Sequence, residues 1–107
     1  VKSHRRHKKV LELTKGYWRK HGNTIRKAKE TLLHADQYSY VGRKAKKRDF
    51  RTLWIMRINA AVRENGMKYS EFIKKMSDKK IEIDRKIMAQ VAVEYPKTFV
   101  KMIEKIK

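Results

Sequence analysis

The stretch VGRKAKKRDFRTLWI, residues 41–55, changes character at its midpoint. Residues 43–51 contain six Lys or Arg side chains and one Asp. Residues 52–55 are almost entirely apolar and include Trp54. A packed core excludes unpaired charges, whereas a solvated tail has no need of a tryptophan. We therefore expect a basic segment and a folded segment to join within this stretch.

The net charge of the chain divides in the same way. The 107 residues carry 30 Lys and Arg against 11 Asp and Glu, a net charge of +19. Residues 1–51 hold 17 basic and 4 acidic side chains, a net charge of +13, and residues 52–107 hold 13 and 7, a net charge of +6. Like charges repel in a compact chain, so a polyanion is the simplest expected partner.

Composition and motifs exclude several classes of protein. There is no cysteine, which rules out disulfides and thiolate zinc sites. No apolar run approaches membrane-spanning length, and no secretory leader is expected. The chain begins at Val1 and not at methionine, so we expect its start to be processed or trimmed. No phosphate loop or catalytic triad is present, so we expect neither an enzyme, a cofactor nor a small-molecule substrate.

Four histidines raise the question of a metal site. His4 and His7 are three residues apart and could face one way on a helix. Five Lys or Arg side chains within residues 2–9 would repel a divalent cation, and Glu12 is the only acid nearby. We therefore expect no metal, and interpret these histidines as neighbours of phosphate.

The second half of the chain repeats apolar residues at helical spacing, and no segment alternates with the period of a strand. We expect a helix from Leu53 to near Gly66, where a glycine can end a helix. Ser70 is predicted to cap the next helix, Asp84 to start a third, and Pro96 to lie in the first turn of a fourth. The buried faces are predicted to contain Phe72, Ile73 and Met76, then Ile83, Ile87 and Val91, then Phe99, Met102, Ile103 and Ile106.

Trp54 is the first large apolar side chain of this half after Leu53. Together with Ile58, Ala61 and Val62 it forms one helical face, and that face needs a partner. We expect Trp54 to be mostly buried, with Ile87 and Val91 as its neighbours. The rival interpretation is that its indole stacks on a base.

The first half has little apolar surface. Residues 2–15 read as a basic helix that ends at Gly16, and residues 16–23 as a turn. A second helix, capped by Asn23 or Thr24, can continue through the basic stretch to Trp54 and beyond, giving about 40 helical residues, or ~60 Å. Gly42 is its weak point. We therefore predict an all-α protein, with a long basic helical extension (residues 1–51) joined to a small helical bundle (residues 52–107).

Aromatic side chains lie among the cations of the first half. Tyr38, Tyr40 and Phe50 interleave with Lys and Arg, a combination that suits RNA, because guanidinium groups bind phosphate and rings stack on exposed bases. A merely solvated charge run is the commoner meaning of such a cluster, but six cations in nine residues beside three aromatic side chains favour RNA binding. A histone-like DNA-compacting protein is the main functional alternative, and a peripheral membrane protein is a second.

Four segments of the chain resemble one known family. RHKKVLELTKGYW, NTIRKAKE, QYSYVGRKAKKRDFRTLWIMRINAAVRENGMKYSEFI and IEIDRKIMAQVAV are similar to the bacterial-type large-subunit ribosomal protein L20 family, with the most specific match over residues 48–66. The resemblance implies an all-helical protein that binds large-subunit ribosomal RNA, supports subunit assembly and contacts neighbouring large-subunit proteins. It implies a ribosomal location, in the bacterial cytoplasm or the mitochondrial matrix in preference to a plastid.

The candidate RNA-contacting residues come from two sources. Positions implied by the resemblance are Arg6, Lys8, Lys9, Lys15, Arg43, Lys44, Lys46, Lys47, Arg48, Arg51 and Arg57, with Asp84, Arg85 and Lys86 from a DRK motif. The basic and aromatic pattern of the first half adds Arg5, Trp18, Arg19, Arg26, Lys27, Tyr38 and Tyr40.

Overall fold

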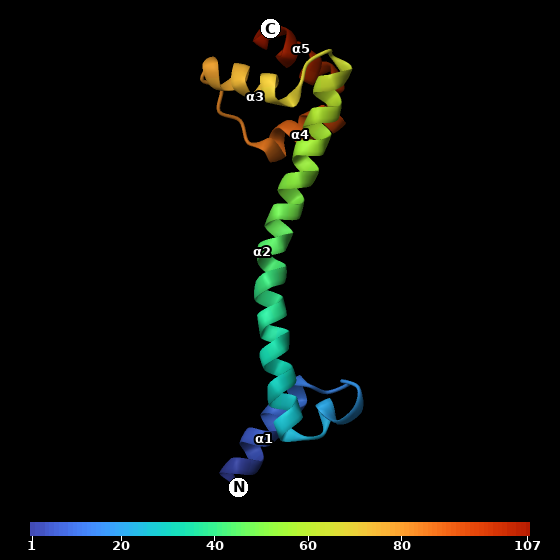
Figure 1. Cartoon of the computed structure of the whole chain (residues 1–107), viewed down its shortest axis with the longest axis vertical. Helices are drawn as coiled ribbons and strands as arrows, with labels where there is room; N and C mark the ends of the chain where they lie inside the picture. The colour runs from blue at the N-terminus through green and yellow to red at the C-terminus, as the bar shows by residue number, and fades with distance from the viewer. The chain divides into compact units, whose positions relative to one another are not determined.

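The structure is a computed structural model that describes all 107 residues. It contains helices and no strand, so the predicted all-α class is confirmed (Figure 1). In chain order the elements are α1 (Lys2–Leu13), the short 3-10 helix η1 (Arg19–Gly22), α2 (Ile25–Glu64), α3 (Tyr69–Asp78), α4 (Arg85–Glu94) and α5 (Pro96–Ile106). The chain divides into two compact units, which are Val1–Ala45 and Lys46–Lys107.

Helix α2 has 40 residues and contains Gly42 without interruption. The predicted long helix is therefore confirmed. It ends where the sequence indicates, because Gly66 has a φ of +77°, a left-handed conformation that glycine adopts without strain. The amide of Met67 donates to the carbonyl of Val62 at 3.2 Å, which closes the helix end.

The two glycines give a matched pair of predictions. Gly66→Ala is expected to destabilise the protein by about 1 kcal/mol, because a Cβ is strained at positive φ. Gly42→Ala is expected to stabilise α2 by roughly 0.5–1 kcal/mol, because alanine favours a helix interior and nothing lies within 4 Å of the added Cβ. Thermal unfolding followed by circular dichroism measures both effects. If both substitutions raised the stability, or both lowered it, the placement of Gly66 at a left-handed helix end and of Gly42 in a helix interior would be contradicted.

In the first unit, α1 and η1 lie beside the N-terminal end of α2 (Figure 1). Only Thr14 and Ala28 are fully buried in this unit. The Thr14 hydroxyl donates to the carbonyl of Leu11 at 3.2 Å. Gly16 has a φ of +87°, which agrees with the predicted end of the first helix and start of the turn. The unit is held by local hydrogen bonds and very little buried apolar surface.

In the second unit, α3, α4 and α5 gather about the C-terminal part of α2 (Figure 1). Helix α5 packs against both α3 and α4. The rings of Phe72 and Phe99 lie 5.8 Å apart in the core. The Lys79 ammonium donates to the carbonyl of Lys105 at 2.6 Å. The buried core consists of Ile58, Val62, Met67, Phe72, Met76, Met88, Ala89, Phe99, Ile103 and Ile106.

Most predicted core positions are confirmed, and one is corrected. Ile87 is 51% exposed, because the α4 register turns Met88 and Ala89 inward in its place. Trp54 is partly buried and packs against the core, as predicted, and so does Val91, whereas Ile87 does not belong to this core.

Of the three helix starts predicted by Ser70, Asp84 and Pro96 in the second half of the chain, two are confirmed. Asp84 is the N-cap of α4, and Pro96 occupies the first turn of α5. Ser70 lies inside α3 and is not its cap, because the helix begins at Tyr69. Lys68 is the N-cap residue, and its amide donates to the Glu71 carboxylate at 3.4 Å.

The contrast in burial predicts different behaviour of the isolated pieces. A fragment of residues 46–107 contains the whole core and is expected to fold alone, and a shorter piece from residue 52 keeps every core side chain. A fragment of residues 1–45 is expected to be largely unstructured when free, because it buries too little apolar surface to offset chain entropy. Circular dichroism of both pieces measures this. A strongly helical, cooperatively melting 1–45 fragment would contradict it.

Candidate nucleic-acid interface

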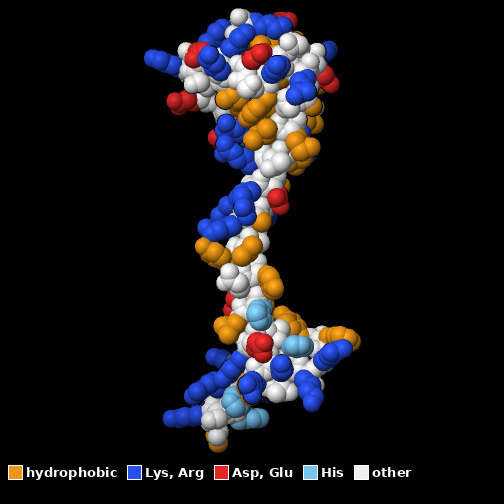
Figure 2. Space-filling model, viewed as in Figure 1, with side chains coloured by type: hydrophobic (Ala, Val, Ile, Leu, Met, Phe, Trp, Pro, Cys, Tyr) orange, Lys and Arg blue, Asp and Glu red, His pale blue; other side chains and the backbone are white.

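One open groove of about 530 Å³ in the second unit brings basic and aromatic side chains together. Its wall on α2 consists of Lys47, Arg48, Phe50, Arg51 and Trp54, and its wall at the start of α4 of Asp84, Arg85 and Lys86. In Figure 2, Lys and Arg side chains on the upper part of α2 border hydrophobic side chains at the base of this unit. Five of the eight groove residues are cations, all of them among the predicted RNA contacts.

Helical spacing places the α2 wall on one face. Positions 47, 51 and 54, and positions 50 and 54, are neighbours on a helix surface. The rings of Phe50 and Trp54 stack, with centroids 6.2 Å apart and planes at 27°. Trp54 also packs against the core, which holds its ring in place in the α2 wall of the groove.

The α4 wall is fixed by one hydrogen bond. The Arg85 Nε donates to the Tyr69 hydroxyl at 3.0 Å, in a partly buried position. This bond orients the guanidinium before any ligand arrives. The N-terminal end of α4 adds the positive end of its dipole, while the Asp84 carboxylate offsets part of that charge.

The groove cations have no acidic partners. Within the two units, the structure contains a single ion pair, between Lys27 and Glu30 at 3.9 Å. The five groove cations are therefore free to bind an anion. Guanidinium groups bind phosphate oxygens in a bidentate way, and aromatic rings accept the face of a base. Such a groove can hold the backbone and one exposed base of a nucleic acid.

The basic run before the groove is exposed on α2. Lys44 lies over the ring of Tyr40 at 5.1 Å, and Lys46 over the ring of Phe50 at 5.8 Å. Tyr38 is 73% exposed. Arg43 is exposed, as is Arg57, which does not line the groove.

The remaining predicted contacts lie in the first unit. Those on and just after α1, which are Arg5, Arg6, Lys8, Lys9 and Lys15, are all exposed. Lys8 and Lys15 line a hollow of about 350 Å³ with His4, His7, Leu11 and Glu12. No group of three or more His, Asp or Glu side chains is arranged to hold a metal ion. No helix combines the length and the apolar composition needed to cross a membrane.

The loop before α2 contributes a further group. The Arg19 guanidinium lies over the Trp18 ring at 4.4 Å, and Trp18 is 77% exposed. Arg26 and Lys27 are exposed in the first turn of α2. The predicted RNA-contacting residues are thus distributed over both units, and five of the basic ones line the groove.

Two groove residues are not among the candidate contacts. In the sequence, Phe50 stands only as an aromatic among cations, and Trp54 is predicted to lie in the core. The signal is nevertheless present, because Phe50 and Trp54 are four residues apart on the face that carries Lys47 and Arg51. An aromatic pair in register with two cations indicates a binding face.

Fold and charge together define a class, that of small, all-helical, polycationic proteins with a surface suited to a polyanion. The family described as Ribosomal protein L20 matches residues 1–102, and the chain belongs to this family. It is therefore a ribosomal protein of the large-subunit type and not an enzyme.

Curated relatives match over the full chain. The protein named large ribosomal subunit protein bL20 of Methylorubrum extorquens (strain PA1) is 50% identical over 107 residues, which is all of this chain and 88% of the relative. The protein of the same name from Xylella fastidiosa (strain M23) is 49% identical over 107 residues, which is all of this chain and 90% of the relative. The resemblance seen in the sequence is thereby confirmed.

Proposed function

We propose that the protein is a structural constituent of the large ribosomal subunit that binds large-subunit ribosomal RNA directly and supports subunit assembly. Family membership supports the ribosomal role, and the relatives are named as large-subunit proteins. The observation that carries direct RNA binding is the groove, where five unpaired cations surround the Phe50–Trp54 stack.

In this proposal the groove binds a stretch of RNA in which a base is exposed. Arg48, Arg51 and Arg85 bind phosphates, and the ring of Trp54 stacks on the base. Arg85 needs little reorganisation to do so, because Tyr69 already orients it. Duplex DNA offers no unstacked base, so the groove favours structured RNA over the DNA-compacting alternative.

The two parts of the chain have different tasks in this proposal. Residues 1–51 act as a basic RNA-binding extension, of which the part before the groove is ordered by its partner, and residues 52–107 act as the globular domain. Neighbouring large-subunit proteins are further partners. The relatives are bacterial, which supports a ribosome in the bacterial cytoplasm, and a mitochondrial ribosome is the alternative.

Crosslinking with mapping of the bound nucleic acid tests the proposal. The full chain is expressed in cells, irradiated and recovered under denaturing conditions, and the attached nucleic acid is sequenced. We expect discrete large-subunit ribosomal RNA positions, with crosslinked peptides that include Trp54. Crosslinks spread evenly over unrelated RNA or over DNA would contradict a specific ribosomal role.

Competition separates the two functional classes. Binding of labelled large-subunit ribosomal RNA is challenged with unlabelled RNA of the same kind or with duplex DNA at equal nucleotide concentration. We expect the RNA to compete much better than the DNA. Equal competition by both would favour the histone-like alternative.

A further inference from the structure

The loop before α2 forms a small basic pocket that is separate from the groove. It has a volume of about 450 Å³ and is lined by Arg19, Lys20, His21 and Lys27. None of these side chains lines the groove of the second unit. Three cations and a histidine around one hollow are suited to an anion.

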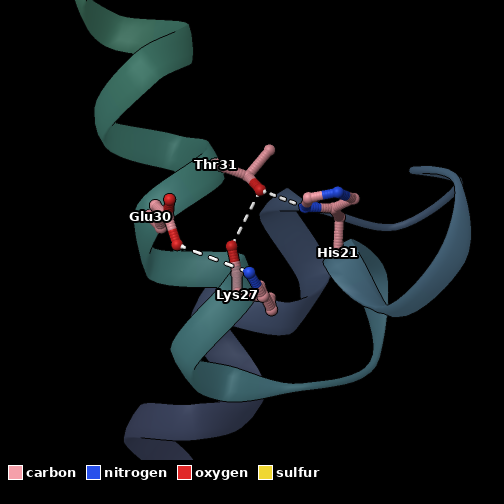
Figure 3. A network of polar contacts seen from close by, with 4 residues as sticks. All are labelled: His21, Lys27, Glu30 and Thr31. Carbon is pink, nitrogen blue, oxygen red and sulfur yellow. Dashed lines mark hydrogen bonds and ion pairs between the residues drawn. The ribbon is translucent and has the colours of Figure 1, made fainter.

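Hydrogen bonds select one tautomer of the neutral histidine in this pocket. The Thr31 hydroxyl donates to the carbonyl of Lys27 at 2.8 Å, so its only hydrogen is already used. The His21 Nδ1 lies 2.8 Å from the same hydroxyl oxygen (Figure 3). The oxygen must therefore accept from His21, and Nδ1 carries the hydrogen. The other ring nitrogen, Nε2, is turned away from Thr31 and is left as an acceptor in the neutral ring (Figure 3).

Backbone contacts define the shape of this loop in the folded chain. The amides of Asn23 and Thr24 both donate to the carbonyl of Lys20, at 3.2 and 3.0 Å. A Cβ at Gly22 would lie 3.1 Å from the carbonyl oxygen of Thr14, so the loop fits closely against the end of α1. Arg19 has a φ of +57°, a strained conformation for a side-chain-bearing residue. Strain of this kind concentrates at binding sites.

We infer that Arg19, Lys20, His21 and Lys27 form a ribose-phosphate pocket for RNA. Arg19 and Lys20 hold a backbone phosphate, and the His21 Nε2 accepts a hydrogen bond from the neighbouring 2′-hydroxyl. Lys27 joins them by exchanging its exposed 3.9 Å pair with Glu30 for the phosphate. This inference rests on the proposed RNA-binding function and adds a contact that DNA cannot make, because only RNA carries the 2′-hydroxyl. Arg19 is oriented for the phosphate by its stack on Trp18.

Interference mapping with 2′-deoxynucleotides tests the pocket. Transcripts of large-subunit ribosomal RNA that carry sparse random 2′-deoxy substitutions are partitioned by the full chain, and the positions at which the substitution weakens binding are read. The wild-type chain is expected to give at least one discrete position with an effect of about fivefold, the size of one hydrogen bond. His21→Ala is expected to abolish the effect there.

Matched variants separate the pocket from charge and folding effects. His34→Ala removes an exposed histidine of α2 that does not line the pocket and should leave the interference position unchanged. Thr31→Val frees the His21 ring and should weaken the effect at the same position while helix content stays constant. Lys27→Gln should weaken it also, and Lys29→Gln should not.

The outcomes distinguish this inference from the proposed function. If His21→Ala binds the RNA as tightly as the wild-type chain and gives the same interference pattern, the proposed contact to the 2′-hydroxyl is wrong, while RNA binding by the protein is unaffected. If the interference signal at this nucleotide disappears in His34→Ala as well as in His21→Ala, the contact to the 2′-hydroxyl cannot be assigned to His21. Failure of the wild-type chain to retain the transcripts would overturn the proposed function and this inference together.

Discussion

Replacing Arg48, Arg51, Arg85 and Lys86 together by Gln is expected to weaken binding to large-subunit ribosomal RNA by on the order of a hundredfold or more near physiological salt. All four side chains line the groove, and none has an acidic partner in its unit. Every cation removed from a phosphate should lower the slope of log affinity against log salt by roughly 0.7–0.9. For the four replacements together, the change in slope is therefore about 3.

A second quadruple variant with the same change in charge is the control. Lys68, Lys74, Lys97 and Lys101 belong to the same unit and lie outside the groove. Their replacement by Gln is expected to have a much smaller effect on affinity and slope. Filter binding over a range of salt concentrations measures both variants, and circular dichroism confirms that each is folded. Equal losses of affinity in the two variants would show that net charge alone decides binding.

Replacing Phe72 by Ala is expected to cost roughly 3–5 kcal/mol of unfolding free energy, the usual loss for a buried phenylalanine. The side chain is fully buried, and its ring meets that of Phe99 in the core. A domain of this size has a total stability of about 5 kcal/mol. The variant should thus keep at most about 2 kcal/mol of stability, and Phe99→Ala should behave similarly.

Ile87→Ala is the matched control, because its side chain is 51% exposed. It is expected to cost less than about 1 kcal/mol, in proportion to the small apolar area removed. Urea unfolding of the 46–107 fragment, followed by circular dichroism, compares the variants. A loss of stability in Ile87→Ala as large as that in Phe72→Ala would mean that residues 83, 87 and 91 form the buried row after all.

The helices of this protein can be predicted from local signals. Gly16 and Gly66 mark chain reversals because each adopts a positive φ, and Pro96 opens a helix because it needs no amide donor there. The long helix through Gly42 is predictable because one glycine costs only about 1 kcal/mol. These signals depend on neighbouring residues alone.

The details that depend on packing cannot be predicted in the same way. Both Ile87 and Met88 fit an apolar stripe in the sequence, and only the orientation of α4 in the unit decides which is buried. The sequence allows Trp54 to belong either to the core or to a binding site, yet its half-buried ring does both, since it contacts the core and lines the groove. The groove forms only where the start of α4 lies beside α2, and the spacing of residues in the sequence does not predict which helices are neighbours.

Because it has few internal ion pairs, the unbound protein behaves as a polyelectrolyte whose stability depends on dissolved salt. With a net charge of +19 and one ion pair within its units, the free chain must draw its neutralising anions from solution. Added salt should then stabilise the folded state by screening repulsion, whereas it weakens a protein held together by salt bridges. The same salt weakens the hold on RNA. A higher ionic strength is therefore expected to stabilise the free folded protein and to weaken its complex with RNA.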